Sequence, residues 1–279
     1  MKKVIISLSI LISCAFSEVT YKNQYANQDK KNPNDTYRAG WNFSADIGYT
    51  SYLINVTSSE LSRVIDYNVL EATLGSSYAY GNWMWGIDTK ILVNEQRSKL
   101  NFKESKNNSI KDIASIDREE FSLFINYKLS EEFRINFLYR YARLKAKDNY
   151  VAFKIYNTLF DYQTNGLASS LVYMPSIFNG FAFSVGAVYS KADIKILETI
   201  NGLEDDVFIN DKSSSVGLKL GVGYNYSLTD KMAFRIISDW YRFDFGKLDV
   251  YSQSQKRVFE KASLNEETYA IRMGITYQF

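Results

Sequence analysis

The feature that most constrains this chain is an alternation of apolar residues with small or polar residues, repeated along most of its length. Successive side chains of a β-strand point to opposite faces, so a period of two predicts strands with two different faces. The set of residues 234–240 has an ambiguous phase, because Ile237 and Tyr241 are also apolar. The ten alternating sets cover residues 41–49, 70–80, 83–93, 121–129, 133–141, 167–173, 181–189, 216–226, 234–240 and 269–279.

The connections between these sets alternate between short and long. The short ones are Gly81–Asn82 and residues 130–132, 175–180 and 229–231. The long ones cover roughly residues 53–66, 95–117, 146–164, 192–214 and 246–265. Transmembrane barrels have an even number of strands, short periplasmic turns and longer external loops. We therefore predict an all-β fold over residues 39–279: a transmembrane, antiparallel, up-and-down β-barrel of about ten strands, with eight or twelve as alternatives.

Two rival folds deserve comparison with the barrel. Residues 162–190 carry no charge, as a transmembrane helix would, but Pro175 and Gly180 interrupt them and the period on each side is two. This segment predicts a hairpin, and a mean hydropathy of −0.25 argues against a helical membrane bundle. A soluble β-sandwich also alternates. However, aromatic residues gather at strand ends, as at Trp83 and Trp85, which favours the interfacial girdles of a membrane barrel.

The N-terminus has the pattern of an export signal. Lys2 and Lys3 precede an apolar run, and Ala15-Phe16-Ser17 places small residues before Glu18, so we expect residues 1–17 to be a cleaved signal peptide. The alternative is lipidation at Cys14, since Leu11–Cys14 resembles a lipobox. Residues 18–38 then form a polar periplasmic tail. Cleavage leaves no cysteine for a disulfide and equal numbers of basic and acidic residues, so net charge gives no case for nucleic-acid binding.

The last strand carries a family resemblance. Its alternating residues, which end on the terminal aromatic, resemble the C-terminal strand of Gram-negative outer-membrane barrel proteins. The resemblance implies an integral outer-membrane protein, surrounded by lipid and lipopolysaccharide. Ten strands with four short and five long connections place both termini in the periplasm. The resemblance also implies recognition of this strand by the barrel-assembly machinery during biogenesis. The residues that carry it are Tyr269, Ile271, Met273, Ile275, Tyr277 and Phe279.

Charged residues occupy the polar phase of the alternation, which we expect to face the lumen. A lone charge in a narrow interior is costly, so these residues must pair or be hydrated. Two interpretations remain open: a salt-bridged plug that holds the barrel shape, and a charged constriction that selects ions or small solutes. Ten strands lie near the size that side chains can fill, so any pore is narrow. The candidates are Asp46, Glu71, Asp88, Lys90, Glu120, Arg134, Arg140, Lys219, Arg235, Asp239 and Arg272.

The chain contains no histidine, which excludes Ser–His and Cys–His nucleophile pairs and histidine general bases. Omptin proteases share the strand count but use an Asp–His pair, so their activity is not carried over, and we expect neither an enzyme nor a cofactor. Glu204-Asp205-Asp206 with Asp211 offers oxygen ligands without EF-hand spacing, and we interpret it as a solvated loop tip with no metal.

The lead function is a narrow porin-like conduit or polar-filled scaffold. The alternative is a surface adhesin or ligand-binding barrel that acts through its long loops. We interpret the basic stretch 97–111 as a solvated loop, and contact with lipopolysaccharide phosphates is its alternative interpretation.

Overall fold

The structure is a computed structural model that describes residues 37–58, 62–93, 96–105, 108–151, 155–200, 207–252 and 257–279. Strands make up most of these residues. The strands are β1 (Tyr37–Thr57), β2 (Ser62–Gly81), β3 (Trp83–Leu92), β4 (Gln96–Ser105), β5 (Asn108–Lys128), β6 (Phe133–Val151), β7 (Ile155–Tyr173), β8 (Phe181–Ile200), β9 (Val207–Ser227), β10 (Met232–Ser252) and β11 (Arg257–Gln278). Within the described ranges, no helix is long and apolar enough to cross a membrane.

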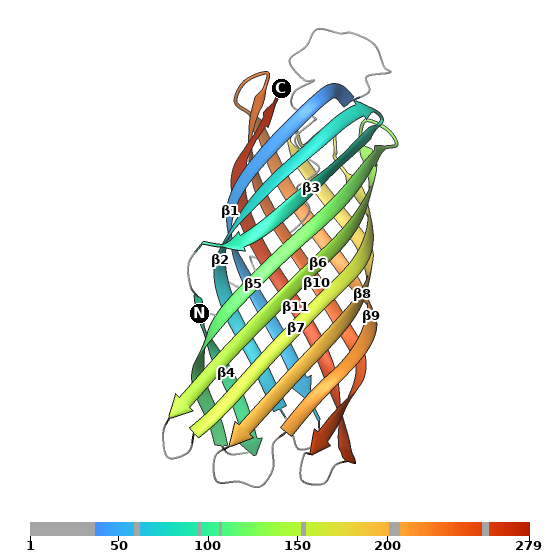
Figure 1. The fold of residues 1–279 in the computed structure, drawn as a ribbon. Helices are drawn as coiled ribbons and strands as arrows, with labels where there is room; N and C mark the ends of the chain where they lie inside the picture. Colours follow the sequence, from blue (N-terminus) through green and yellow to red (C-terminus); the bar gives the residue numbers. More distant parts are fainter. Residues whose placement is uncertain are drawn as a thin grey trace.

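These strands close into a barrel. β3 and β4 are short and together occupy one strand position of the barrel, between β2 and β5. Each of these two neighbours pairs with both β3 and β4. β1 pairs with β11 from Asn42 opposite Gln278 to Thr57 opposite Ser263, which joins the two ends of the sheet. The result is a closed antiparallel barrel of ten strands (Figure 1) and confirms the predicted fold class.

The four predicted short turns lie at one end of the barrel, together with the start of β1 and the end of β11 (Figure 1). We call this the terminal end and the opposite one the distal end. The β2–β3 turn consists of Gly81 and Asn82, with Gly81 at φ +59°, a conformation that side-chain-bearing residues rarely adopt. The charge-free segment 162–190 forms the β7–β8 hairpin, as its period of two predicted.

The predicted long loops are wrong. Apart from β3 and β4, the strands are 19 to 22 residues long, about twice the 9–11 residues that cross a bilayer. Most described residues in the five predicted loop ranges therefore belong to strands that continue past the lipid-facing band towards the distal end. The alternation persists there with its polarity reversed: Ile54 and Val56 of β1 point inward, while Asn55 points outward. Because the outward residues become polar, the sequence there resembled solvated loops.

The outer wall of the terminal half is apolar. Phe43 and Ile47 of β1 and Ile275 of β11 are each about half exposed, as expected for side chains that face lipid. Aromatic pairs gather near the terminal end, with Trp41 against Tyr78 and Trp83 against Tyr127. The ambiguous phase of β10 is resolved, because Ile236 is exposed on the wall while Ile237 is only 1% exposed inside the barrel.

The interior changes character along the barrel axis. Near the terminal end it holds polar side chains such as Asn42 and Asn126 beside two small apolar clusters, one around Met84 and one around Met174. Charged residues occupy the middle. The distal half is filled by one continuous apolar core. Its buried members are Tyr52, Ile54, Val56, Ile65, Tyr67, Val69, Ile116, Leu144, Ala146, Phe160, Tyr162, Ala168, Val188, Ala192, Ile194, Ile196, Ile209, Phe243, Phe245, Leu248, Val250, Ala262 and Leu264.

Candidate functional site

The candidate site is the charged layer in the middle of the lumen, supplied by the inward phase of most strands. The side chains of all eleven residues singled out in the sequence point into the interior, and most are nearly inaccessible to solvent. Eight of them are at most 9% exposed: Asp46, Glu71, Glu120, Arg134, Arg140, Lys219, Arg235 and Asp239. The other three, Asp88, Lys90 and Arg272, are intermediate. The strand order decides which of these side chains meet.

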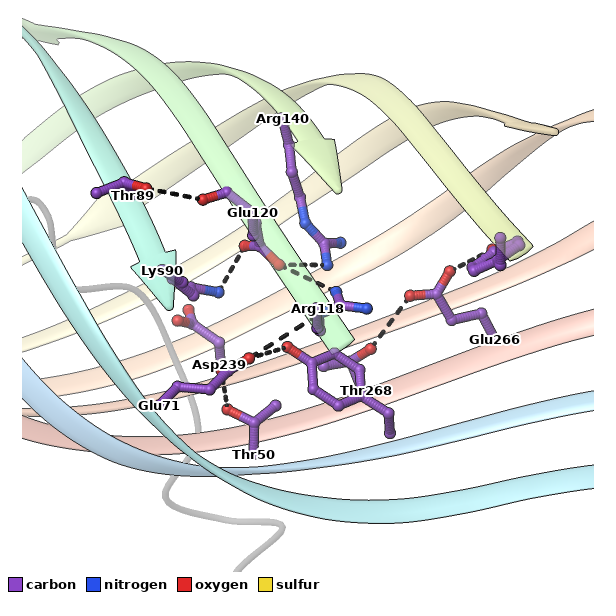
Figure 2. A network of polar contacts seen from close by, with 12 residues as sticks. Thr50, Glu71, Thr89, Lys90, Arg118, Glu120, Arg140, Asp239, Glu266 and Thr268 are labelled. Carbon is purple, nitrogen blue, oxygen red and sulfur yellow. Dashed lines mark hydrogen bonds and ion pairs between the residues drawn. The ribbon is translucent and has the colours of Figure 1, made fainter. Parts of the chain in front are cut away.

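Glu120 of β5 is the hub of this layer (Figure 2). Its Oε1 lies 2.6 Å from Nζ of Lys90 on β3. Its Oε2 accepts hydrogen bonds from Arg118, at 3.1 Å, and from Arg140 on β6, at 2.9 Å. One carboxylate is therefore shared by three cations, and these hydrogen bonds with ionised partners are the strong kind.

A second carboxylate, Glu71 of β2, lies on the other side of Arg118. Its Oε1 is 3.9 Å from Nε of Arg118 and accepts a hydrogen bond from the Tyr52 hydroxyl at 3.0 Å. The Thr50 hydroxyl donates to Oε2 at 2.7 Å. The Arg118 guanidinium also lies 3.8 Å from the Tyr52 ring centre and donates to the Tyr67 hydroxyl at 3.2 Å. The charged layer is thus joined to the apolar core through the two stacked tyrosines.

Two further ion pairs lie beside the barrel closure: one reaches from β10 past β11 to β1, and the other joins β10 to β11. Arg235 binds Asp46 of β1 through two parallel hydrogen bonds, of 2.7 Å from Nε and 2.6 Å from a terminal nitrogen. Arg272 of β11 donates to Asp239 of β10. Gly274 lies between Asp46 and Arg235 in the register, and a side chain there would collide with the Asp46 carboxylate. Glycine therefore leaves the space in which this pair forms.

Sequence reasoning missed two charged members of the layer. Arg118 lies two residues before Glu120 and points inward as Glu120 does. Glu266 lies two residues before the inward-pointing Thr268 and also points inward. Glu266 accepts hydrogen bonds from Tyr162 at 2.5 Å and from Thr268 at 3.4 Å. Both residues preceded the apolar sets used to define the strands. Extending each alternation by a few residues would have found them.

A small cavity lies at the centre of the layer. Its volume, measured as the space open to the centre of a water molecule, is about 40 Å³. That is room for a few waters, since each needs about 10–15 Å³ by this measure. Thr73 and Asn136 line it, and each keeps a buried side-chain oxygen without a protein hydrogen bond. Asp88 also lines it. The arrangement suits a few bound waters, and it is far too small for a general solute.

The remaining predicted residues have separate places. Lys219 lies 5.8 Å from the Tyr241 ring centre, beside the cavity. Arg134 is buried towards the terminal end and does not line the cavity. Residues 1–36 and Glu204-Asp205-Asp206 lie outside the described part of the chain, as do the side chains of 97–111. Asp211 accepts backbone hydrogen bonds from Lys212 and Asp249, and the described residues contain no group of three metal-ligating side chains.

Charged pairs also occur on the outer surface of the distal half, beyond the apolar band. Arg143 of β6 binds Asp161 of β7 through two hydrogen bonds, of 3.0 and 2.6 Å. The hydrogen bond from Arg143 lowers the pKa of Asp161, and the same bond raises the pKa of Arg143. Lys191 and Lys195 are exposed on β8, while Asp193 pairs with Lys212 of β9. This surface is polar and charged, as expected of a wall that faces water.

Comparison with known proteins identifies the fold. No protein-family model matches the sequence, and no curated protein resembles it. The crystal structure of the outer membrane protease OmpT from Escherichia coli is similar, with a TM-score of 0.62 and 11% identity over 88% of this chain and 100% of that chain. The translocator domain of the autotransporter NalP from Neisseria meningitidis is also similar, with a TM-score of 0.53 and 12% identity over 93% of each chain. The fold is therefore that of an integral outer-membrane β-barrel protein.

Proposed function

We propose that this protein is a non-conducting outer-membrane barrel, a filled scaffold that raises its distal end above the lipid. The observation that carries the proposal is the apolar core in the distal half of the lumen. Tyr52, Ile54 and Val56 of β1 have no accessible surface, and apolar side chains from β2 and from β5 to β11 pack in the same interior. Over the residues that the structure describes, such an interior offers no hydrated path for an ion. Of the two interpretations of the lumenal charges, the salt-bridged plug fits better than the constriction.

Recordings in planar lipid bilayers test this proposal. We expect the purified, folded protein to give no discrete conductance steps, and the same silence from Arg140→Ala and Arg272→Ala. Heat-modifiable migration in gels checks that each sample is folded. Discrete steps whose ion selectivity shifts in Arg140→Ala would overturn the proposal, because that residue lies in the charged layer.

The orientation and the assembly route also belong to the proposal. We propose that the terminal end faces the periplasm and that the barrel-assembly machinery reads the last strand. Tyr269 is partly exposed and the five alternating residues from Ile271 to Phe279 are exposed on the outer wall, and the backbone N–H of Phe279 donates to the carbonyl of Trp41 at 2.9 Å. Deletion of Phe279 should lower the outer-membrane level of the protein far more than Glu119→Ala on the outer distal surface. Equal levels would contradict this role.

A second candidate function is surface binding through the distal end. It is favoured by the length of the strands, which hold a charged wall and five hairpin connections beyond the lipid band. Deletion of residues 97–111 is not a clean test, because these residues belong largely to paired strands β4 and β5. Replacing 201–206, which connect β8 and β9, with a short glycine–serine linker leaves both strands intact. Unchanged binding to cells or lipopolysaccharide after this exchange would count against that connection as the binding element.

We also propose that the protein is not an enzyme, although OmpT is a protease. The support is chemical: the chain has no histidine, and its single cysteine, Cys14, lies in the proposed leader. The carboxylates of the charged layer are engaged in ion pairs, accept hydrogen bonds from hydroxyl groups as Glu266 does, or lie beside a cavity too small for a peptide. Incubation of the folded protein with a fluorogenic peptide library should give no cleavage above that of a heat-inactivated sample. Cleavage abolished by Asp88→Asn would refute this part of the proposal.

A further inference from the structure

The β7–β8 turn differs from the three other turns at the terminal end. It contains Ile177, whose side chain is 81% exposed, and Phe178, which is 55% exposed. The tips of the other turns are polar or charged, with Asn82 in the first, Glu131 and Glu132 in the second, and Asp230 and Lys231 in the fourth. The β5–β6 and β9–β10 connections each contain one exposed leucine, Leu129 at 51% and Leu228 at 47%, so it is the pair of large apolar side chains at its tip that distinguishes the β7–β8 turn.

The turn is held in a defined conformation by hydrogen bonds. The N–H of Phe178 donates to the carbonyl of Pro175 at 3.2 Å, and the N–H of Phe181 donates to the carbonyl of Phe178 at 3.0 Å. The neighbouring β5–β6 turn supports it from the side. There Glu132 accepts from the N–H of Met174 through its carbonyl and from the N–H of Ser176 through its carboxylate, both at 2.8 Å. The backbone thus fixes the two apolar side chains in exposed positions.

The exposed side chains continue the lipid-facing wall. Tyr173 and Phe181, the last residue of β7 and the first of β8, are 37% and 39% exposed on that wall. Tyr173 stacks on Phe133 and Phe181 packs against Tyr224, with ring centres 5.0 and 4.9 Å apart. Aromatic residues in this position typically mark the membrane–water interface. Ile177 and Phe178 lie a few residues beyond this belt, in the turn between β7 and β8.

We propose that the β7–β8 turn is a membrane-interface anchor, in which Ile177 and Phe178 insert among the lipid headgroups of the leaflet at the terminal end. Insertion removes two apolar side chains from water, which is favourable in proportion to the area covered. The turn contributes no charged side chain of its own, and the carboxylate that contacts it, Glu132, accepts a hydrogen bond from the N–H of Ser176. The inference requires an embedded barrel but is independent of whether the lumen conducts and of what the distal end binds.

Site-directed spin labelling tests the anchor directly. The only cysteine is Cys14, so Cys14→Ser provides a background for single labels at Ile177→Cys, Asp230→Cys and Ile275→Cys in lipid vesicles. For each label, the rate of collision with oxygen, which concentrates in lipid, is compared with the rate of collision with a nickel chelate, which stays in water. We expect the label at 177 to favour oxygen, close to the lipid-facing control at 275, while the label at 230 in the β9–β10 turn favours the chelate.

The outcomes separate the lipid from other partners. A label at 177 that behaves like the label at 230 overturns the proposal, while the control at 275 shows whether the barrel is embedded. If the shielding at 177 disappears when lipid is raised tenfold over protein, contact with a second copy is responsible and the proposal fails. A second variant pair guards against effects of the label itself. Phe178→Trp should shift the added tryptophan emission to shorter wavelength on reconstitution, and Lys231→Trp should shift it less.

Discussion

The central and distal parts of the lumen are built from the same strands but contain opposite chemistry. On β1, the buried inward residues Asp46 and Thr50 bind charged or polar partners, and Ile54 and Val56 a few residues later belong to an apolar core. The difference follows from what lies outside the wall. At the level of the lipid, an apolar side chain gains nothing by turning inward, because lipid tails are as apolar as a protein core. Beyond the lipid, the outside is water, and burial of apolar side chains becomes the main source of stability.

The two regions should therefore respond differently to substitution. The charged layer depends on the compensation of each ion by its partners, so the loss of one carboxylate leaves several buried cations without their shared partner. The apolar core depends on packing, so the loss of a side chain leaves a cavity. Two substitutions probe this comparison directly, and two more extend it to the terminal end of the lumen and to the outer surface of the distal half.

The largest effect is expected from Glu120→Ala. The change leaves Lys90, Arg118 and Arg140 without their shared carboxylate. Removal of one partner from a buried ion pair typically costs about 3–5 kcal/mol. Urea unfolding in lipid vesicles measures the free energy of unfolding, and Glu119→Ala on the exposed face of the same strand is the control, with a change expected within about 0.5 kcal/mol. A cost as small as that of the control would show that water reaches these cations freely.

The next effect is expected in the apolar core. Ile194 of β8 has no accessible surface, and Ile194→Ala should lower the free energy of unfolding by about 2–5 kcal/mol. Lys195→Ala provides the matched control in the same urea experiment, because Lys195 is the next residue of β8 and its side chain is exposed. If the two variants unfold alike, the distal half is not packed as a core, and the proposal of a non-conducting barrel fails.

A smaller effect is expected near the terminal end. Asn42 is only 3% exposed, and neither side-chain amide atom has a hydrogen-bond partner in the protein. If water solvates this part of the lumen, Asn42→Ala exchanges bound water for bulk water and changes the free energy of unfolding by at most about 1 kcal/mol. Asn136→Ala is the comparison, because the Asn136 amide donates to Asn126 at 2.6 Å and its loss should cost more. The opposite order would indicate a dry terminal half.

The smallest effect concerns the outer surface of the distal half. Because Arg143 lowers the pKa of Asp161 on folding, this pair stabilises the fold above the ordinary carboxyl pKa of about 3.9. The contribution is lost as the pH falls through the lowered pKa of the folded state. Thermal unfolding of the protein and of Asp161→Asn should therefore differ slightly at pH 7 and converge in strong acid. If the thermal stabilities of the protein and of Asp161→Asn still differ by the same amount in strong acid, the effect comes from packing and not from charge.

The sequence by itself determined the class of fold and the direction of most side chains. A period of two requires strands with distinct faces, and it correctly gave about ten strands, the four short turns and the inward direction of Asp46, Glu120 and Arg235. The absence of histidine restricts the available chemistry whatever the fold, because no other side chain supplies an imidazole. The signal peptide and the tail remain predictions, since residues 1–36 lie outside the described part of the chain.

Only the tertiary structure decided how far the strands extend and which charges meet. The polarity of the alternation reverses where lipid gives way to water, and a single sequence does not mark that level, so strand extensions around Ile54 and Ile194 were interpreted as loops. The Arg235–Asp46 pair joins residues 189 positions apart, and its partners are set by the register across the barrel closure. Ion pairing between distant strands is a property of the closed barrel, because only closure fixes which inward side chains share a level.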